Sequence, residues 1–336
     1  MILQTLDIAD NCQGIYHEGE FLFSEYNKKL LDYNAAWKHT PMMQHSNVKK
    51  YLYILTRGRP LQEYSPDKDK FLEMQDLIFA HRKALDTADV NLQGVCFYDA
   101  IPEHILTNWF DTKLEALEVI ESTCLVEDDY DILLKAHFLA SAIRRSKITY
   151  KSEKRVINYN IFGSSTGRLT TNKGSLPIHN IKKEQRSDIV PSNSAFVEID
   201  FNAAEIRTLL ALSGREQPQS DIHEWISKEV FLGKHDREES KVKLFSWLYN
   251  ISASDTDLAK FFSREIFRDF YNRENSTLKT PFGRSLQVDE RKAQNYLLQS
   301  TTSDIVVENT FKILNLLRER KSQIAFTLHD SVVIDL

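Results

Sequence analysis

Two aspartates stand at the ends of short hydrophobic runs that are typical of β-strands. Asp200 lies near the end of the run 195–201, and Asp330 lies between the runs 324–328 and 332–334. A carboxylate at the end of a hydrophobic strand needs something to compensate its partial burial, and a divalent cation is one such partner. Magnesium binds one or two protein carboxylates, and two such ions can activate an attacking hydroxyl and stabilise the leaving oxygen. From spacing alone, two unrelated strand-end aspartates remain the simpler interpretation.

A second set of residues repeats every four positions along one predicted helix: Arg237, Lys241, Phe245 and Tyr249. This spacing places all four side chains on one helical face, with the cations at the N-terminal end and the aromatic rings at the C-terminal end. Such a face could bind a triphosphate through its cations and a base and sugar through its rings. An ordinary amphipathic helix with the two rings in the core is the alternative.

A third set, Arg291, Asn295 and Gln299, has the same spacing. The minor groove of DNA offers acceptors in nearly the same place on every base pair, so these donors could check the shape of a pair without reading its sequence. A polar, solvent-facing helix stripe is the simpler alternative when this set is taken alone.

Charge is distributed unevenly along the 336 residues. The net charge is −5, which by itself argues against a protein that coats nucleic acid. However, residues 142–186 contain eleven Lys or Arg against Glu153 and Glu184, so this basic strip carries about +9 and the rest of the chain about −14. Such a strip could neutralise phosphates, or could simply be a solvated face.

Composition and periodicity indicate a mixed α+β fold. A hydrophobic content of 42% excludes a disordered or fibrous chain, and 10 glycines and 8 prolines are few for an all-β protein. Apolar spacing predicts helices over 67–85, 102–121 and 129–143 and a possible strand pair at 3–8 and 21–23. A helix is also predicted directly after the strand 195–201, a hairpin with Asp330 at its tip near the C-terminus, and long helices between these β elements.

Three cysteines that lie far apart suggest neither a disulfide framework nor a metal site. Together with the lack of an apolar run long enough to span a bilayer, they lead us to expect an intracellular protein, with no membrane partner, from a bacterial or phage-infected cytoplasm.

Taken in chain order, the motifs resemble the family A, bacterial polymerase I-like, DNA polymerases. The resemblance covers roughly residues 143–336 and is carried by Thr166-Gly167-Arg168-Leu169, Asp200-x4-Glu205-Ile206-Arg207, Asp221-Ile222-His223, the Arg237 to Tyr249 helix, Thr280-Pro281-Phe282-Gly283-Arg284, the Arg291/Asn295/Gln299 stripe and His329-Asp330.

The resemblance implies a right-hand polymerase fold: a palm with an antiparallel sheet, helical fingers and a helical thumb. The expected division is an N-terminal segment of unknown role at 1–60, a thumb-like helical region at 61–150, palm at 151–215, fingers at 216–285 and a second palm part at 286–336.

It also implies roles for individual residues in a template-directed DNA polymerase that adds dNTPs to a primer 3′-hydroxyl. Asp200 and Asp330 match the aspartates that hold two Mg²⁺ ions, and Glu205 matches the glutamate that excludes a ribose 2′-hydroxyl. The residues expected to contact the incoming nucleotide are His223, Arg237, Lys241, Phe245 and Tyr249. Lys241 is also expected to be catalytic. The expected contacts to primer-template DNA are Arg168, Arg284, Arg291, Asn295, Gln299 and His329.

The sequence departs from the family pattern at several positions. Ser331 follows Asp330 where the family usually has Glu, and the resulting His-Asp-Ser resembles the single-subunit, phage-type RNA polymerases. The phage-type RNA polymerases are therefore the main alternative to the family A DNA polymerases. They rank below them because they have neither the glutamate at position 205 nor the phenylalanine at position 245. A DNA-binding but inactive or split polymerase subunit is the other alternative.

Two expectations concern the ends of the chain. Asp7 and Asp10 do not form the Asp-x-Glu of a proofreading exonuclease, so no 3′-to-5′ activity is expected. The sequence stops six residues after Asp330, where family members continue. A truncated gene, a partial record or a second polypeptide that completes the palm would each explain this.

Overall fold

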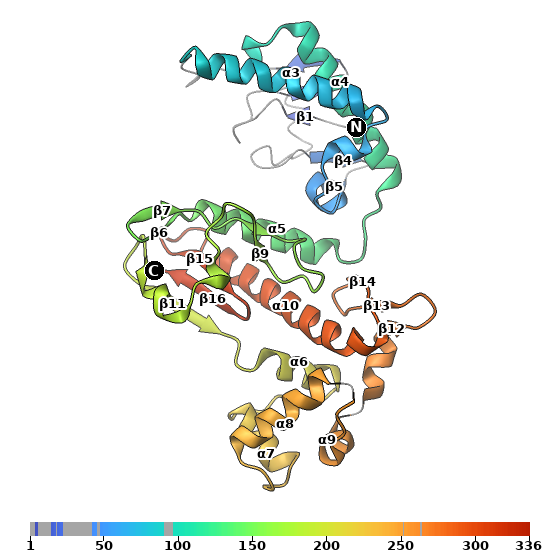
Figure 1. The fold of residues 1–336 in the computed structure, drawn as a ribbon, viewed down its shortest axis with the longest axis vertical. Coiled ribbons are helices and arrows are strands. Elements are labelled where there is room, and N and C mark those ends of the chain that lie inside the picture. The colour runs from blue at the N-terminus through green and yellow to red at the C-terminus, as the bar shows by residue number, and fades with distance from the viewer. Residues whose placement is uncertain are drawn as a thin grey trace. The chain divides into compact units, whose positions relative to one another are not determined.

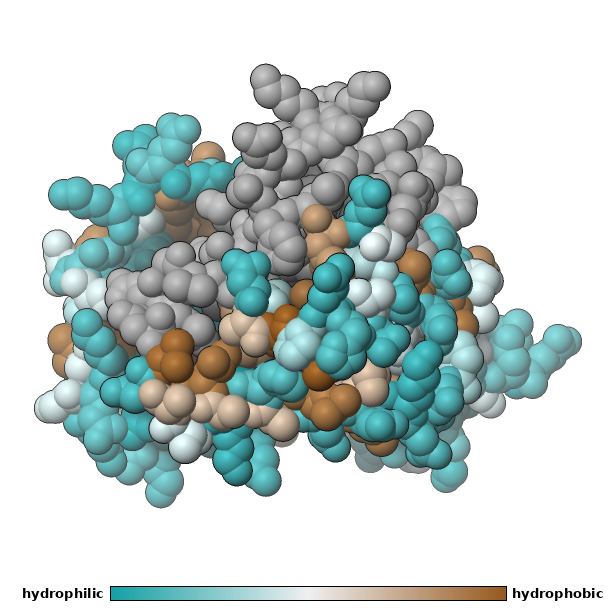
Figure 2. Space-filling model, turned by 90° about the horizontal axis from the view of Figure 1, so that it is seen from above, coloured by the Kyte–Doolittle hydropathy of each residue, from teal (hydrophilic) through white to brown (hydrophobic). Residues whose placement is uncertain are grey.

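The computed structural model describes residues 4–5, 15–17, 19–22, 42–45, 48–90, 97–250, 252–262 and 264–336. The chain divides into two compact units, Met1–Val126 and Glu127–Leu336 (Figure 1). Within the described residues, no helix is both long and apolar enough to cross a membrane. Of the described residues that are visible in Figure 2, most are hydrophilic, with smaller hydrophobic areas between them.

The first unit contains two long helices that confirm the predicted ones, α3 (Lys68–Thr87) and α4 (Glu103–Thr123). Asp67 caps α3 by accepting a hydrogen bond from the Lys70 amide, and Pro102 immediately precedes α4. The shorter elements of this unit are β1 (Gln4–Thr5), β2 (Ile15–His17), β3 (Glu20–Leu22), β4 (Met42–His45), β5 (Val48–Tyr51), α2 (Leu52–Leu55), η1 (Leu61–Tyr64) and η2 (Phe97–Ala100).

The predicted pairing of the first two strands was wrong. β1 and β3 do not pair with each other, because β2 lies between them and pairs with both in an antiparallel three-stranded sheet. The short strand β2 lacks a long β-branched run, so it was not predicted from the sequence.

The second unit is an α+β structure, as predicted. Its central sheet has the order β11-β16-β15, formed by β11 (Phe196–Asp200), β15 (Gln323–Leu328) and β16 (Ser331–Asp335), all antiparallel. These are the predicted strand and the predicted C-terminal hairpin. Smaller sheets are formed by β6 (Ile148–Tyr150), β7 (Glu153–Arg155) and β10 (Ile189–Val190), and by β8 (Tyr159–Asn160) and β9 (Thr170–Thr171).

Helices make up most of the remainder of this unit. The longest, α10 (Glu290–Leu316), packs against α5 (Tyr130–Arg145), α6 (Ala204–Leu212) and α8 (Arg237–Tyr249) (Figure 1). The others are α7 (Ile222–Glu229), α9 (Thr256–Phe261), η3 (Ile178–Asn180), η4 (Lys183–Asp188) and η5 (Arg264–Phe270).

Two features of this unit differ from the sequence-based expectations. The segment between β11 and the hairpin is not only helical, since it also contains the antiparallel sheet of β12 (Tyr271–Asn272), β13 (Thr277–Lys279) and β14 (Ser285–Gln287). In addition, the expected thumb-like region 61–150 is divided, because α5 packs on α10 and β15 and belongs to the second unit.

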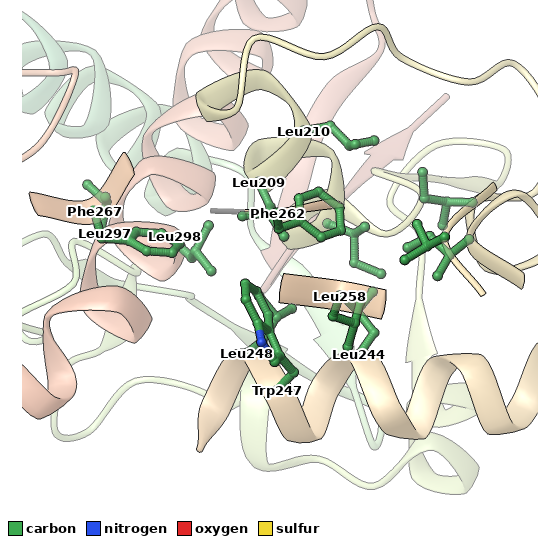
Figure 3. Packing of buried hydrophobic residues seen from close by; sticks show 14 of the residues in the cluster. Leu209, Leu210, Leu244, Trp247, Leu248, Leu258, Phe262, Phe267, Leu297 and Leu298 are labelled. Carbon is green, nitrogen blue, oxygen red and sulfur yellow. The ribbon is translucent and has the colours of Figure 1, made fainter. Parts of the chain in front are cut away.

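A hydrophobic core fixes the helices that carry candidate site residues. Leu209 of α6, Leu244 and Trp247 of α8, Leu258 of α9 and Leu297 of α10 are all buried in it, and Figure 3 shows these side chains converging from the separate helices. Each fully buried leucine contributes about 1.5 to 3 kcal/mol. The positions of α6 and α8 relative to α10 are therefore set by packing that does not involve the polar faces of these helices.

Candidate active site

The central sheet brings Asp200 and Asp330 together. Asp200 is the last residue of β11, and it pairs in register with Ser331, the first residue of β16. His329 and Asp330 form the two-residue connection between β15 and β16, where His329 adopts a left-handed conformation with φ of 52°. The amide of Phe201 donates a hydrogen bond of 3.0 Å to the carbonyl of Asp330, which locks the two strand ends side by side.

Negative charge is concentrated at this corner of the sheet. The pKa of Asp200 is raised, first by burial and then by the charges of Asp330 and Glu198. Glu198 lies two residues before Asp200 on β11, so both side chains project from the same face of the strand. The Ser331 hydroxyl donates a hydrogen bond of 2.7 Å to Glu198 Oε1.

Glu205 extends this cluster from the first turn of α6. Its carboxylate forms an ion pair of 2.8 Å with Arg168, which follows Gly167 in the predicted DNA-binding motif. Burial raises the pKa of Glu205, the Arg168 guanidinium opposes that rise, and the charge of Asp330 adds to it. The structure thus groups Asp200, Asp330, Glu205 and Arg168, four residues that the sequence analysis selected from three separate motifs.

His329 lies beside this group and faces another imidazole. Its ring centroid is 5.2 Å from that of His179. Burial, followed by the charges of His329 and Arg186, lowers the pKa of His179 to about 4. His179 is therefore neutral near pH 7, whereas His329 is exposed to solvent.

Arg237, the first of the two predicted cations of α8, lies beside the N-terminus of α7. Arg237 donates to both carboxylate oxygens of Asp221, at 3.2 and 3.0 Å, and also contacts Glu238. Asp221 simultaneously caps α7 by accepting from the amides of His223 and Glu224. The Arg237 guanidinium and the helix amides lower the pKa of Asp221 to about 2.

His223 is buried against the same helix face. Its ring is 6.2 Å from that of Phe245, and within the part of the chain that the structure describes its buried Nδ1 has no hydrogen-bond partner. Burial lowers the pKa of His223; the carboxylate of Asp221 opposes this effect, and the cations Arg237 and Lys241 reinforce it. These four side chains therefore form one electrostatic group.

The aromatic half of the α8 face is partly open to solvent. Phe245 and Tyr249 stack with ring centroids 5.8 Å apart and planes inclined by 3°, and Tyr249 is 40% exposed. The neighbouring Leu244, Trp247 and Leu248 fill the core instead. The alternative in which both rings lie in the core is therefore wrong for Tyr249. Phe245 is partly buried against the core.

The polar stripe on α10 lies against the C-terminal end of α8. Asn295 Nδ2 donates to the carbonyl of Tyr249 at 3.4 Å, and the adjacent Gln294 donates to the carbonyl of Leu248 at 2.9 Å. Arg291 is exposed and paired with Asp289, and Gln299 is partly buried. These contacts satisfy carbonyls at the helix end that would otherwise lack partners.

Arg284, expected at the DNA, occupies a different environment. Its guanidinium is buried and bound to both carboxylate oxygens of Asp304 on α10, at 2.8 to 2.9 Å. Burial raises the pKa of Asp304 to about 6, although the paired Arg284 opposes that rise. An arginine committed to a buried carboxylate is a structural residue, so the placement of Arg284 does not support a DNA contact.

The basic strip lines a cleft in the second unit. The cleft has a volume of about 710 Å³ and lies between β6, β7 and the segment 173–177. Its walls carry Arg144, Lys154, Arg155 and Lys173 together with Tyr150, and Arg155 also contacts Glu153. Four of the eleven basic residues of the strip thus line one cleft, where they could bind phosphates.

The carboxylates fit a hard divalent cation by the chemistry of their donors. Asp200 and Asp330 supply oxygen ligands from adjacent strand ends, and their mutual repulsion is the kind that a bound cation relieves. No group of three or more His, Cys, Asp or Glu among the described residues has the arrangement of a metal site. Two carboxylates are nevertheless sufficient for magnesium, which usually retains several waters and binds substrate phosphates.

Three carboxylates important to these groups were given no role from the sequence: Glu198, Asp304 and Asp221, although Asp221 stands in the Asp221-Ile222-His223 motif. A signal existed for Asp221, because an aspartate directly before a helical pattern predicts an N-cap. Another existed for Asp304, since a lone carboxylate within a run of small and apolar helix positions requires a partner. Asp7 and Asp10, on which the expectation about proofreading rested, lie outside the described residues.

No protein-family model matches the chain. A curated relative, the DNA polymerase I of Chloroflexus aurantiacus, is 24% identical over 229 residues, which are 53% of this chain and 24% of that protein. The matched region of this chain is therefore similar to part of a DNA polymerase I. This region spans about a quarter of the length of the curated relative that it matches.

Among solved structures, the chain is similar to the polymerase domain of Pol1 from M. smegmatis in complex with DNA primer-template and dNTP. The similarity has a TM-score of 0.44 and 16% identity, and it covers 84% of this chain and 60% of that one.

Proposed function

We propose that this protein is a template-directed DNA polymerase that adds dNTPs to the 3′-hydroxyl of a primer. The observation that carries the proposal is the proximity of Asp200, at the end of β11, to Asp330, which directly precedes its register partner Ser331; both lie next to Glu205. The similarity to DNA polymerase I gives independent support.

Asp200 and Asp330 would hold two magnesium ions. When bound, such ions lower the pKa of the attacking hydroxyl and stabilise charge on the leaving oxygen. The chain contributes a rigid platform for them, because β11 and β16 are joined in register and the Phe201 amide ties the strand ends together. Glu205, held by Arg168, would stand against the sugar and exclude a ribose 2′-hydroxyl.

The open face of α8 would bind the incoming nucleotide. Arg237 and Lys241 supply positive charge for the triphosphate, and the exposed part of the Phe245 and Tyr249 stack supplies an apolar surface for the base. Arg237 would exchange its bond to Asp221 for phosphate oxygens. His223, buried beside these cations, would donate from its ring to the same triphosphate.

The cationic cleft would lie along the primer-template duplex. Because it gathers four Lys or Arg side chains, binding there releases counterions and weakens steeply with salt. Arg168, Arg291, Asn295, Gln299 and His329 would contact DNA near the primer terminus. In this assignment the sheet β11-β16-β15 and its surroundings are the palm, α7 to α9 the fingers and α3 to α4 a thumb-like region.

Primer extension tests the proposal. A labelled primer-template is incubated with the full chain and Mg²⁺, with dNTPs or with NTPs, across a series of salt concentrations. Extension by dNTPs that falls steeply with salt is the expected result. Preference for NTPs would instead assign the chain to the RNA polymerase alternative, and binding without extension to an inactive subunit.

A further inference from the structure

The position after Asp330 is occupied by a hydroxyl residue, and that hydroxyl holds a carboxylate from the neighbouring strand. Ser331 is buried, and its Oγ lies 2.7 Å from Glu198 Oε1. A hydrogen bond to a carboxylate is among the stronger ones in proteins. The contact joins β16 to β11 across the strand pair in which Ser331 is opposite Asp200.

The register explains why Glu198 can reach this position. Glu198 pairs with Val333, so Ser331 is its diagonal neighbour on the same face of the sheet. Since successive side chains alternate between the two faces, Glu198 and Asp200 project together while Val197 and Ile199 project from the other face. A third carboxylate therefore stands on the Asp200 face, and it comes from β11.

Glu198 stands at an exposed position of β11. Its carboxylate accepts the hydrogen bond from Ser331. Among the described residues, Glu198 forms no ion pair with a Lys, Arg or His side chain, whereas Glu205 and Asp304 each pair with an arginine.

We propose that Glu198, positioned by Ser331, is an auxiliary carboxylate of the metal site, which increases the affinity of the Asp200 and Asp330 pair for divalent cations. This inference rests on the proposed function. In the family pattern, the residue directly after Asp330 is usually a glutamate. Here that position is Ser331, and the negative charge comes instead from Glu198 on the adjacent strand. Glu198 attracts the cation through its negative charge and does not coordinate it directly.

The test compares Glu198→Gln, Glu198→Asp and Ser331→Ala with the wild-type chain. Glu198→Gln keeps the acceptor for Ser331 but removes the charge, so the Mg²⁺ concentration for half-maximal extension should rise about three- to tenfold, the effect of one nearby charge on a divalent ion. The rate at saturating Mg²⁺ should be nearly unchanged. Glu198→Asp should restore most of the affinity, and Ser331→Ala should give a smaller, two- to threefold, rise.

A second readout does not depend on activity. Mn²⁺ is titrated into each full-length variant and free Mn²⁺ is measured by electron paramagnetic resonance; Glu198→Gln should weaken binding by a similar factor. Glu274→Gln is the matched control, because Glu274 is exposed in the β12 to β13 connection of another sheet. It makes the same change of net charge and should behave as wild type.

The outcomes separate this inference from the proposed function. If wild type extends primers, Asp200→Ala does not, and Glu198→Gln requires the same Mg²⁺ and binds Mn²⁺ as wild type does, the inference is wrong and the polymerase assignment stands. If wild type fails to extend primers, the polymerase assignment is wrong, and the Mn²⁺ titration alone decides whether Glu198 strengthens cation binding.

Discussion

Removal of the Arg284 guanidinium should destabilise the second unit in a pH-dependent manner. In Arg284→Met the buried carboxylate of Asp304 loses both of its charged hydrogen-bond donors. Breaking a buried ion pair by removing one partner costs about 3 to 5 kcal/mol, because the remaining charge is left uncompensated. We therefore expect a loss of that size in the free energy of unfolding near pH 8.

The sign of the pH dependence follows from the pKa of Asp304. Burial raises this pKa to about 6 in the folded protein even with Arg284 in place, and Arg284 acts to lower it. Without Arg284 the folded pKa rises further, so the folded variant binds more protons than folded wild type above pH 6. The destabilisation by the substitution should consequently grow by up to about 1.4 kcal/mol per pH unit from pH 6 toward the pKa of the variant, and be smallest near pH 5.

Urea unfolding followed by far-ultraviolet circular dichroism at pH 5, 6, 7 and 8 measures this difference. The control is the double variant Arg284→Met/Asp304→Leu, which removes both charges and should recover much of the stability and lose the pH dependence. A destabilisation that is independent of pH would refute the reasoning. So would an unchanged stability with weakened DNA binding, since that result would make Arg284 a DNA contact as the sequence first suggested.

Two further substitutions test the surroundings of the site. Gly167→Ala should lower the free energy of unfolding by about 1 to 3 kcal/mol, because φ is +76° and the added Cβ would lie 2.6 Å from Arg284 Cζ. Gly174→Ala is the control: this glycine also has a positive φ, but an added Cβ would have no atom within 4 Å. It should therefore lose less stability in the same urea titration. Glu205→Ala should increase NTP use relative to dNTP use about tenfold or more in single-nucleotide extension, because it removes the carboxylate expected to block a 2′-hydroxyl, and unchanged discrimination would contradict that role.

The sequence predicted the elements whose signals are local. The C-terminal hairpin followed from two β-branched or aromatic runs around His329 and Asp330, and the structure has β15 and β16 there. The open face of α8 followed from four-residue spacing, and Asp236 with Glu239 closes a capping box at the predicted start. Spacing within one element is set by helix or strand geometry, so it can be read without knowledge of the fold.

The parts that the sequence could not predict depend on which elements meet. The bond from Ser331 to Glu198 requires the register of β11 on β16, and the burial of Arg284 requires the carboxylate of Asp304 from α10. From sequence, Ser331 was only a departure from a family pattern and Arg284 only another cation in a motif. Long-range packing also assigned α5 to the second unit, although its own periodicity resembles that of α3 and α4.

The most direct test of the account is single-nucleotide incorporation by Asp200→Asn, Asp330→Asn and wild type under single-turnover conditions with saturating Mg²⁺. Asp269→Asn is the control, because it makes the same chemical change at an exposed position of η5. We predict that both site variants lose at least a hundredfold in rate, since metal-ion stabilisation of the transition state is worth several kcal/mol, whereas the control retains the wild-type rate. Incorporation by Asp200→Asn or Asp330→Asn at the wild-type rate would contradict the central claim that this carboxylate pair performs the chemistry.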